Sequence, residues 1–156
     1  MIPFPRRRAL AAAASMALLP GCAAYDLLFA TRVAVRRIEI RVADGINDNS
    51  PVALDLVHLS GNRTLIEEVA KMTAEDWFGR KAQLRRDFRD EVDVRSWEVV
   101  PGQLLPRAWL DRPQVNRAAF LFARYRAPGP HRYRLTENDT DILVVLEASG
   151  FSVTPA

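Results

Sequence analysis

The sequence predicts a mainly β domain, an antiparallel β-sandwich with a small two-helix insertion. Three observations predict it. Several short segments alternate apolar and polar residues or are apolar throughout, turn residues separate these segments, and apolar residues show helical spacing only between about residues 64 and 88. The length of 156 residues suits one domain, and 49% hydrophobic with 26% charged residues is typical of a globular protein.

The first 22 residues have the pattern of a bacterial export signal. Three arginines, Arg6–Arg8, precede the apolar stretch Ala9–Leu19, which is too short to span a membrane. The motif Leu19-Pro20-Gly21-Cys22 follows and resembles a lipobox, in which the cysteine is lipidated and becomes the first residue after cleavage. We therefore expect residues 1–21 to be a signal peptide and Cys22, the only cysteine, to carry a covalent lipid. The arginines leave open whether the general secretory or the twin-arginine route exports the chain.

Removal of the signal peptide changes the charge of the chain. The whole sequence has 22 basic and 19 acidic residues, a net charge of +3, but three of the arginines lie within residues 1–21. The mature chain therefore has equal numbers of basic and acidic residues, which gives no support to nucleic-acid binding. Residue 23 is Ala rather than Asp, and by resemblance to enterobacterial lipoproteins this predicts the outer membrane, facing the periplasm.

The mature chain begins with a tether and a pair of strands. Residues 22–35 are expected to be the lipidated cysteine and its tether, part of which already packs, and residues 36–156 the sandwich. Alternation over residues 37–42 predicts the first strand. Residues 43–51 form a loop by composition, too long for a tight hairpin turn, so we expect this loop to protrude. Residues 52–59 predict a second strand that is buried on much of both faces.

Helical spacing follows the second strand. We expect two short helices, at about residues 65–72 and 74–88. The segment Thr64–Glu67 has the pattern of a capping box for the first helix, and Thr73–Asp76 looks like a weaker one for the second.

Strand patterns then return to the end of the chain. The most apolar segment, residues 118–125, is expected to be a central strand, whereas Pro106 confines residues 104–110 to a sheet edge. The other expected strands lie at residues 92–100, 131–135, 141–147 and 151–154.

The sequence contains no arrangement of residues typical of catalysis. One cysteine and two histidines leave little room for a metal site. His58, in an apolar strand, is expected to be a structural histidine with satisfied ring nitrogens, and His131 a surface group at a turn. Acidic residues between 87 and 93 are interleaved with arginines, which favours an ion-pair surface over a cation site. We therefore expect no enzymatic activity, no small-molecule substrate and no cofactor beyond the lipid on Cys22.

The order of these parts resembles a known family of lipoproteins. Over about residues 22–126, it is similar to the outer-membrane lipoproteins of the type VI secretion system, the TssJ or VasD-like family. The resemblance rests on the lipobox, the alternating first strand and the helical insertion, together with the residues Asn47–Val52, Leu54, Leu56, Leu59, Asp76-Trp77-Phe78, Leu84 and Val99-Val100-Pro101-Gly102.

The resemblance implies a fold and a function. The fold is a transthyretin-like β-sandwich with a small helical addition. The function is to anchor the type VI secretion membrane complex to the outer membrane as a non-catalytic lipoprotein that faces the periplasm. In the family, the loop between the first two strands docks on the periplasmic end of the IcmF-like inner-membrane subunit (TssM). The corresponding candidate partner-binding residues are Asp44, Gly45, Ile46, Asn47, Asp48 and Asn49.

Two points stay open at this stage. Ile46 is apolar in a polar loop, so it is either a buried anchor at that interface or folds back onto the edge of the sandwich. Two other functions also fit the sequence: an assembly lipoprotein of another envelope machine, such as type IV secretion or a pilus, and a lipid-tethered periplasmic binding protein or enzyme.

Overall fold

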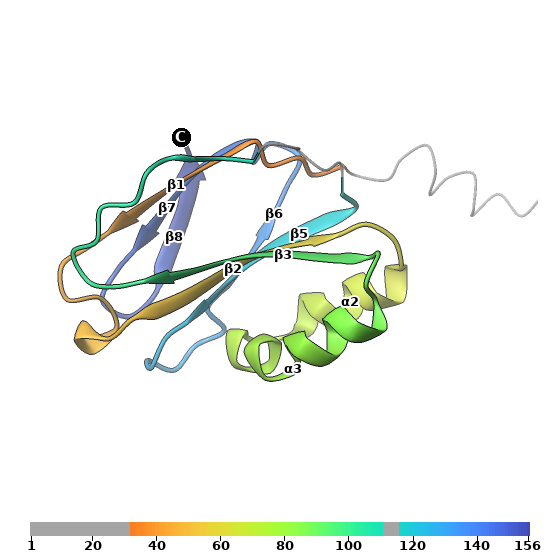
Figure 1. Cartoon of the computed structure of the whole chain (residues 1–156), viewed down its shortest axis with the longest axis horizontal. Coiled ribbons are helices and arrows are strands. Elements are labelled where there is room, and N and C mark those ends of the chain that lie inside the picture. Colours follow the sequence, from red (N-terminus) through yellow and green to blue (C-terminus); the bar gives the residue numbers. More distant parts are fainter. Residues whose placement is uncertain (1–31, 111–115) are drawn as a thin grey trace, which may run out of the picture. The chain divides into compact units, whose positions relative to one another are not determined.

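Two four-stranded sheets face each other in the computed structural model, which describes residues 32–110 and 116–156 (Figure 1). The first sheet has the order β4-β1-β7-β8 and the second the order β3-β2-β5-β6. Cys22, the signal peptide and most of the tether lie outside the described residues. The strands are β1 (Arg37–Val42), β2 (Val52–Leu59), β3 (Val92–Val99), β4 (Ala108–Trp109), β5 (Ala118–Arg124), β6 (Arg132–Leu135), β7 (Asp141–Leu146) and β8 (Phe151–Pro155).

The predicted β-sandwich with a two-helix insertion is confirmed, with one correction to its strand pairing. β1 pairs with β7 in parallel, from Arg37 opposite Asp141 to Val42 opposite Leu146, so the first sheet is mixed. The reason is the path of the chain, which crosses to the second sheet directly after β1. Parallel neighbours need such a crossover, because a short turn can only join antiparallel strands.

The core lies between the two sheets and begins before β1. Val33 and Val35 are buried in it, so packing starts within the segment expected to be a tether. Residues at alternate positions of the strands point inward, as the sequence pattern of residues 37–42 predicts. The largest buried side chains of this layer are Ile38, Ile46, Leu54, Leu56, Leu121, Leu135 and Ile142.

Helices α2 (Arg63–Lys71) and α3 (Ala74–Asp87) cover the outer face of the second sheet (Figure 1). Trp77 of α3 stacks on Phe122 of β5, with ring centroids 5.2 Å apart and an interplanar angle of 11°. Beside this pair, the buried carboxylate of Asp55 accepts hydrogen bonds from Trp77 Nε1 at 2.8 Å and from Lys81 Nζ at 3.0 Å. One aromatic stack and one buried polar cluster therefore fix α3 on the sheet.

The two helix starts differ in how well the sequence predicts them. The capping box at Thr73 is confirmed, because Thr73 N donates to Asp76 Oδ2 and Asp76 N donates to Thr73 Oγ1. The box at Thr64 is wrong, since α2 begins earlier and Asn62 Oδ1 accepts from Thr64 N at 2.9 Å. Asparagine is among the strongest N-caps, so Asn62 takes the position that the sequence pattern assigns to Thr64.

Candidate functional site

At the end of the sandwich where β1 leads to β2, Asn47 forms hydrogen bonds through both its backbone and its side chain. Its backbone N–H donates to Ala148 O at 2.9 Å, in the β7–β8 connection. Its Oδ1 accepts from Arg126 N at 2.7 Å, in the β5–β6 connection, and its Nδ2 donates to Pro51 O at 3.0 Å. Buried Asn47 therefore links three connections and leaves no amide group of its side chain unpaired.

The backbone around Asn47 is left-handed. Gly45 has φ 70°, and Asn47, Asp48 and Asn49 have φ values of 48°, 53° and 55°. Asparagine and aspartate enter this region more readily than other residues with a side chain, so the residue types of the loop match its conformation. Ser50 N donates to Asn47 O at 3.0 Å and completes the turn.

The loop at residues 43–51, which the sequence predicts to protrude, does not join neighbouring strands of one sheet. β1 pairs with β4 and β7, whereas β2 pairs with β3 and β5, so residues 43–51 cross from one sheet to the other. The crossing is compact, because the left-handed turn and the hydrogen bonds of Asn47 hold it against two other connections. A shorter hairpin turn could not replace this loop.

The structure places the six candidate partner-binding residues in two groups. Asp44, Gly45, Asp48 and Asn49 are exposed, whereas Ile46 and Asn47 are buried. Ile46 is 0% exposed and belongs to the core between the sheets, so it folds back and is not an anchor presented to a partner. Two carboxylates, one amide side chain and a glycine thus form the accessible part of the loop.

A groove that the sequence analysis missed lies beside this loop. It has a volume of about 520 Å³ and runs between the edge of β1 and the connection from β3 to β4. Leu104, which the sequence analysis places in an edge strand, is 97% exposed at this groove. The sequence does contain a feature that indicates this exposed connection: Pro101 and Pro106 flank Leu104 and exclude regular strand pairing there.

An acidic residue between two arginines lies in the same groove. Glu39 accepts hydrogen bonds from Arg41 Nε at 3.0 Å and from Arg107 Nε at 2.9 Å. The hydrogen bond from Arg41 and the positive charges of both arginines lower the pKa of Glu39 from its ordinary value. Glu39 is therefore ionised at neutral pH, and the two guanidinium groups share one carboxylate.

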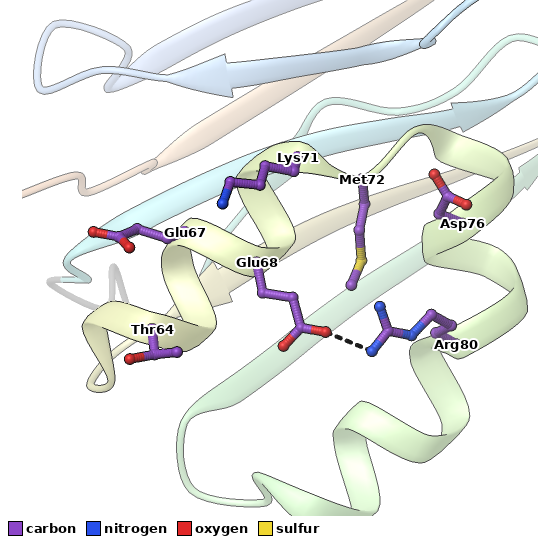
Figure 2. Close-up of a pocket in the computed structure, with 7 residues that line it drawn as sticks. All are labelled: Thr64, Glu67, Glu68, Lys71, Met72, Asp76 and Arg80. Atoms are coloured by element: carbon purple, nitrogen blue, oxygen red, sulfur yellow. Dashed lines mark hydrogen bonds and ion pairs between the residues drawn. The ribbon is translucent and has the colours of Figure 1, made fainter.

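A second groove, of about 460 Å³, lies between α2 and α3 (Figure 2). Glu68 of α2 and Arg80 of α3 point toward each other across it and form an ion pair at 2.5 Å. Asp76 at its rim already serves the cap of α3. Glu67, a further lining residue, pairs with Arg63 outside the groove, so each of these charged groups already has a partner within the chain, and Glu68 and Arg80 are the pair that spans the groove.

His58 is buried, as the sequence predicts, but its ring nitrogens are not satisfied. It is 4% exposed, and neither ring nitrogen has a hydrogen-bond partner within the described part of the chain. The Asp93 carboxylate lies 3.7 Å from His58 Nδ1, too far for a hydrogen bond. Burial lowers the pKa of His58, against the opposing effect of Asp93, so the ring is neutral at pH 7.

The acidic residues near the end of α3 have separate local roles. Asp87 accepts hydrogen bonds from Gln83 Nε2, and Glu91 Oε2 accepts from Asn62 N at 2.8 Å. Over residues 32–110 and 116–156, no group of three or more His, Cys, Asp or Glu side chains is arranged to hold a metal ion. Across the same two ranges, no helix is long and apolar enough to cross a membrane.

Comparisons with known proteins agree on the fold. No protein-family model matches the sequence, and no curated protein matches it. The type VI secretion system (T6SS) lipoprotein TssJ1 from Pseudomonas aeruginosa matches with a TM-score of 0.54 and 20% identity, over 81% of this chain and 98% of that one. Lip from Serratia marcescens, a membrane-bound component of the type VI secretion system, matches with a TM-score of 0.55 and 12% identity, over 81% of this chain and 97% of that one.

A third match comes from a structure of the T6SS protein TssM C-terminal domain (869–1107) from EAEC. Its matched chain gives a TM-score of 0.52 and 15% identity over 78% of this chain and 99% of that one. The match covers 78% of this 156-residue chain and almost all of the other chain. That other chain is therefore shorter than the segment 869–1107. At these identities the likeness is one of fold. The described part of this chain therefore has the fold of the TssJ-like lipoproteins of the type VI secretion system.

Proposed function

We propose that this chain is a non-catalytic lipoprotein that anchors the type VI secretion membrane complex to the outer membrane. It is lipidated at Cys22, faces the periplasm and binds the IcmF-like inner-membrane subunit, TssM. The observation that carries the proposal is the extent of the structural match. The matched region covers 81% of this chain and 98% of the TssJ1 chain, so the likeness extends over nearly the whole of that lipoprotein chain.

The position of the loop within the domain supports this proposal. Val33 pairs with Asn116, next to the start of β5 and the Leu59 end of β2. The candidate loop meets β2 at its other end, Val52. Eight strand residues at ~3.4 Å each separate the two ends by roughly 25 Å, so the loop lies at the end of β2 remote from Val33. Figure 1 shows the described segment before β1 starting on the right of the domain and the short helical turn before β2 at the lower left.

The chemistry of the accessible loop suits a protein partner. Asp44 and Asp48 are exposed acids, and Asn49 adds an exposed amide. Because the hydrogen bonds of Asn47 fix the loop, little conformational entropy is lost when a partner binds it. A complementary surface would therefore present basic side chains and hydrogen-bond donors.

Co-purification tests the proposal. The full-length chain and an IcmF-like subunit of the same organism are expressed together, and the complex is isolated from detergent-solubilised membranes. We expect the two to co-purify, and Asp44→Lys with Asp48→Lys to weaken binding by about tenfold, or about 1.4 kcal/mol. The matched control, Asp87→Lys with Asp90→Lys, makes the same charge change at other exposed positions and should bind normally.

Two results would contradict the proposal. Failure of the unchanged chain to bind the IcmF-like subunit would overturn the proposed partner and favour another envelope machine. Equal binding by both double variants would keep the partner but remove the loop from the interface.

A further inference from the structure

The outer edge of β1 is paired over only part of its length. On that side, β4 contacts Arg37 and Ile38 alone, through Trp109 and Ala108, and Leu110 N donates to Arg36 O. Beyond this short pairing, the connection between β3 and β4 separates from β1. Within the described residues, the rest of β1 is therefore an edge strand without a partner on this side.

The hydrogen-bonding direction of each β1 residue follows from its pairing with β7. Arg37 N and Ala43 N both donate to the β7 side, to Thr140 O and Leu146 O. Because backbone groups alternate direction along a strand, the N–H and C=O groups of Ile40 and Val42 point to the open edge. Among residues 32–110 and 116–156, no backbone hydrogen bond joins residues 39–42 to residues 100–107.

The chain's own neighbouring connection is unsuited to complete the ladder. In a continued antiparallel register Pro106 would lie opposite Ile40, and proline has no N–H to donate. The groove of about 520 Å³ occupies this place. Its floor is the edge of β1, and its far wall carries the exposed Leu104 together with the half-buried Leu105.

The charges along the groove indicate what it would accept. Arg41 and Arg107 have side chains 63% and 62% exposed, whereas Glu39, the carboxylate that they share, is 16% exposed. The groove thus presents two accessible cations with the shielded Glu39 between them, and one exposed acid, Asp44 of the candidate loop. A segment with a carboxylate would pair with these arginines at the surface, and an apolar side chain would cover Leu104.

We propose that this groove receives an extended, acidic and apolar segment of a partner protein, which adds to β1 as a new edge strand. Main-chain hydrogen bonds to Ile40 and Val42 supply affinity, and the contacts with Leu104 and Arg41 select the sequence. The inference rests on the proposed function, in which the partner is the IcmF-like subunit. Asp44 lines this groove and also belongs to the candidate loop, so the two surfaces are continuous.

Hydrogen exchange measures this interaction directly. The amide exchange of the full-length chain in detergent is followed with and without the periplasmic domain of the IcmF-like subunit. We expect exchange at Ile40 and Val42 to slow by more than about tenfold on binding. The amides of Glu39 and Arg41, which point to β7, should be protected in both states and serve as an internal control.

A pair of variants supports the measurement. Leu104→Asp should remove the added protection of Ile40 and Val42 and weaken binding by about tenfold, because it places a carboxylate on the apolar wall. Trp109→Asp is the matched control. It changes another exposed apolar residue, which does not line the groove, and should bind as the unchanged chain does.

Each other outcome decides against the inference in its own way. Binding without added protection at Ile40 and Val42 overturns strand addition and leaves the proposed function intact. No binding by the unchanged chain overturns both. Protection without the partner means that another occupant already covers the edge: a second copy if the protection depends on concentration, and the chain itself if it does not.

Discussion

Asp55 on β2 and Trp77 on α3 share a buried hydrogen bond of 2.8 Å, from the indole N–H to the carboxylate. Lys81 Nζ donates to the same carboxylate oxygen at 3.0 Å. The helical insertion is therefore attached to the sheet through a charged group inside an otherwise apolar layer. Removing one member of a buried charged cluster costs more than the cluster contributes, because its partners stay desolvated.

Replacement of Asp55 should strongly destabilise the domain. Asp55→Ala leaves the Lys81 ammonium and the Trp77 N–H without their acceptor, and we expect a loss of about 3 kcal/mol in the free energy of unfolding. Trp77→Phe keeps the stack on Phe122 but loses one hydrogen bond, which should cost about 1–2 kcal/mol. Urea denaturation of the full-length chain measures both. The exposed Glu67→Ala is the control, and a loss under about 1 kcal/mol for Asp55→Ala would contradict the role of the cluster.

Substitutions at Asn47 separate its hydrogen bonds from its backbone conformation. Asn47→Gly loses the bonds to Pro51 O and Arg126 N but keeps the left-handed conformation accessible, and it should cost about 1–3 kcal/mol. Asn47→Ala adds the steric cost of a left-handed residue, about 1 kcal/mol more. Thermal unfolding should rank the two variants in this order. The exposed Asn49→Gly should change stability by less than about 0.5 kcal/mol, and equal losses for both Asn47 variants would show that the conformation is not strained.

The buried ring of His58 should make the domain less stable in acid. Burial lowers the pKa of His58 in the folded state, whereas in the unfolded chain it is about 6.5. As the pH falls below about 6.5, the unfolded state takes up a proton that the folded state does not, so stability falls. The slope from this one group reaches at most about 1.4 kcal/mol per pH unit.

Urea titrations between pH 7.5 and pH 5.5 measure this dependence. His58→Leu is the comparison, because it removes the titrating group and fills its place in the core with an apolar side chain. We expect the variant to lose most of the dependence on pH in this interval. The same slope in both proteins would assign the acid sensitivity to other groups.

Lipidation at Cys22 is a prediction of the sequence alone. Labelling cells with a palmitate analogue should mark the unchanged chain and leave Cys22→Ser unmarked. The variant should also accumulate as an unprocessed form that retains its signal peptide, because cleavage follows lipidation in lipoproteins of this type. Equal labelling of both chains would place the lipid elsewhere or show that there is none.

Local patterns predicted the elements of this fold well. Alternation over residues 37–42 located β1, and the apolar segment at residues 118–125 located a central strand. Patterns of this kind depend on neighbouring residues, whose spacing directly reflects a strand or a helix. The start of α2 was predicted slightly too late, because Asn62 rather than Thr64 caps the helix. This error also concerns neighbouring residues only.

Strand pairing was harder to predict from the sequence, and the errors about the loop at residues 43–51 follow from the wrong pairing. Nothing in residues 43–51 reveals that β1 and β2 belong to different sheets, because that choice depends on partners far along the chain. The burial of Ile46 follows from the same choice, since the crossing passes over the open end of the core. The strand expected at residues 104–110 is reduced to Ala108–Trp109, because the prolines that flank Leu104 oppose pairing.

The parallel pairing of β1 with β7 also has a consequence for the order in which the domain folds. The partners Arg37 and Asp141 are about a hundred residues apart, and this side of β1 has no other strand to join. Loop closure over such a distance is slow, whereas β2, the two helices and β3 are close in sequence and can assemble early. As the chain emerges N-terminus first, β1 must therefore wait until β7 has been delivered. Truncations that remove β7 should consequently leave β1 paired with β4 alone and prone to aggregate.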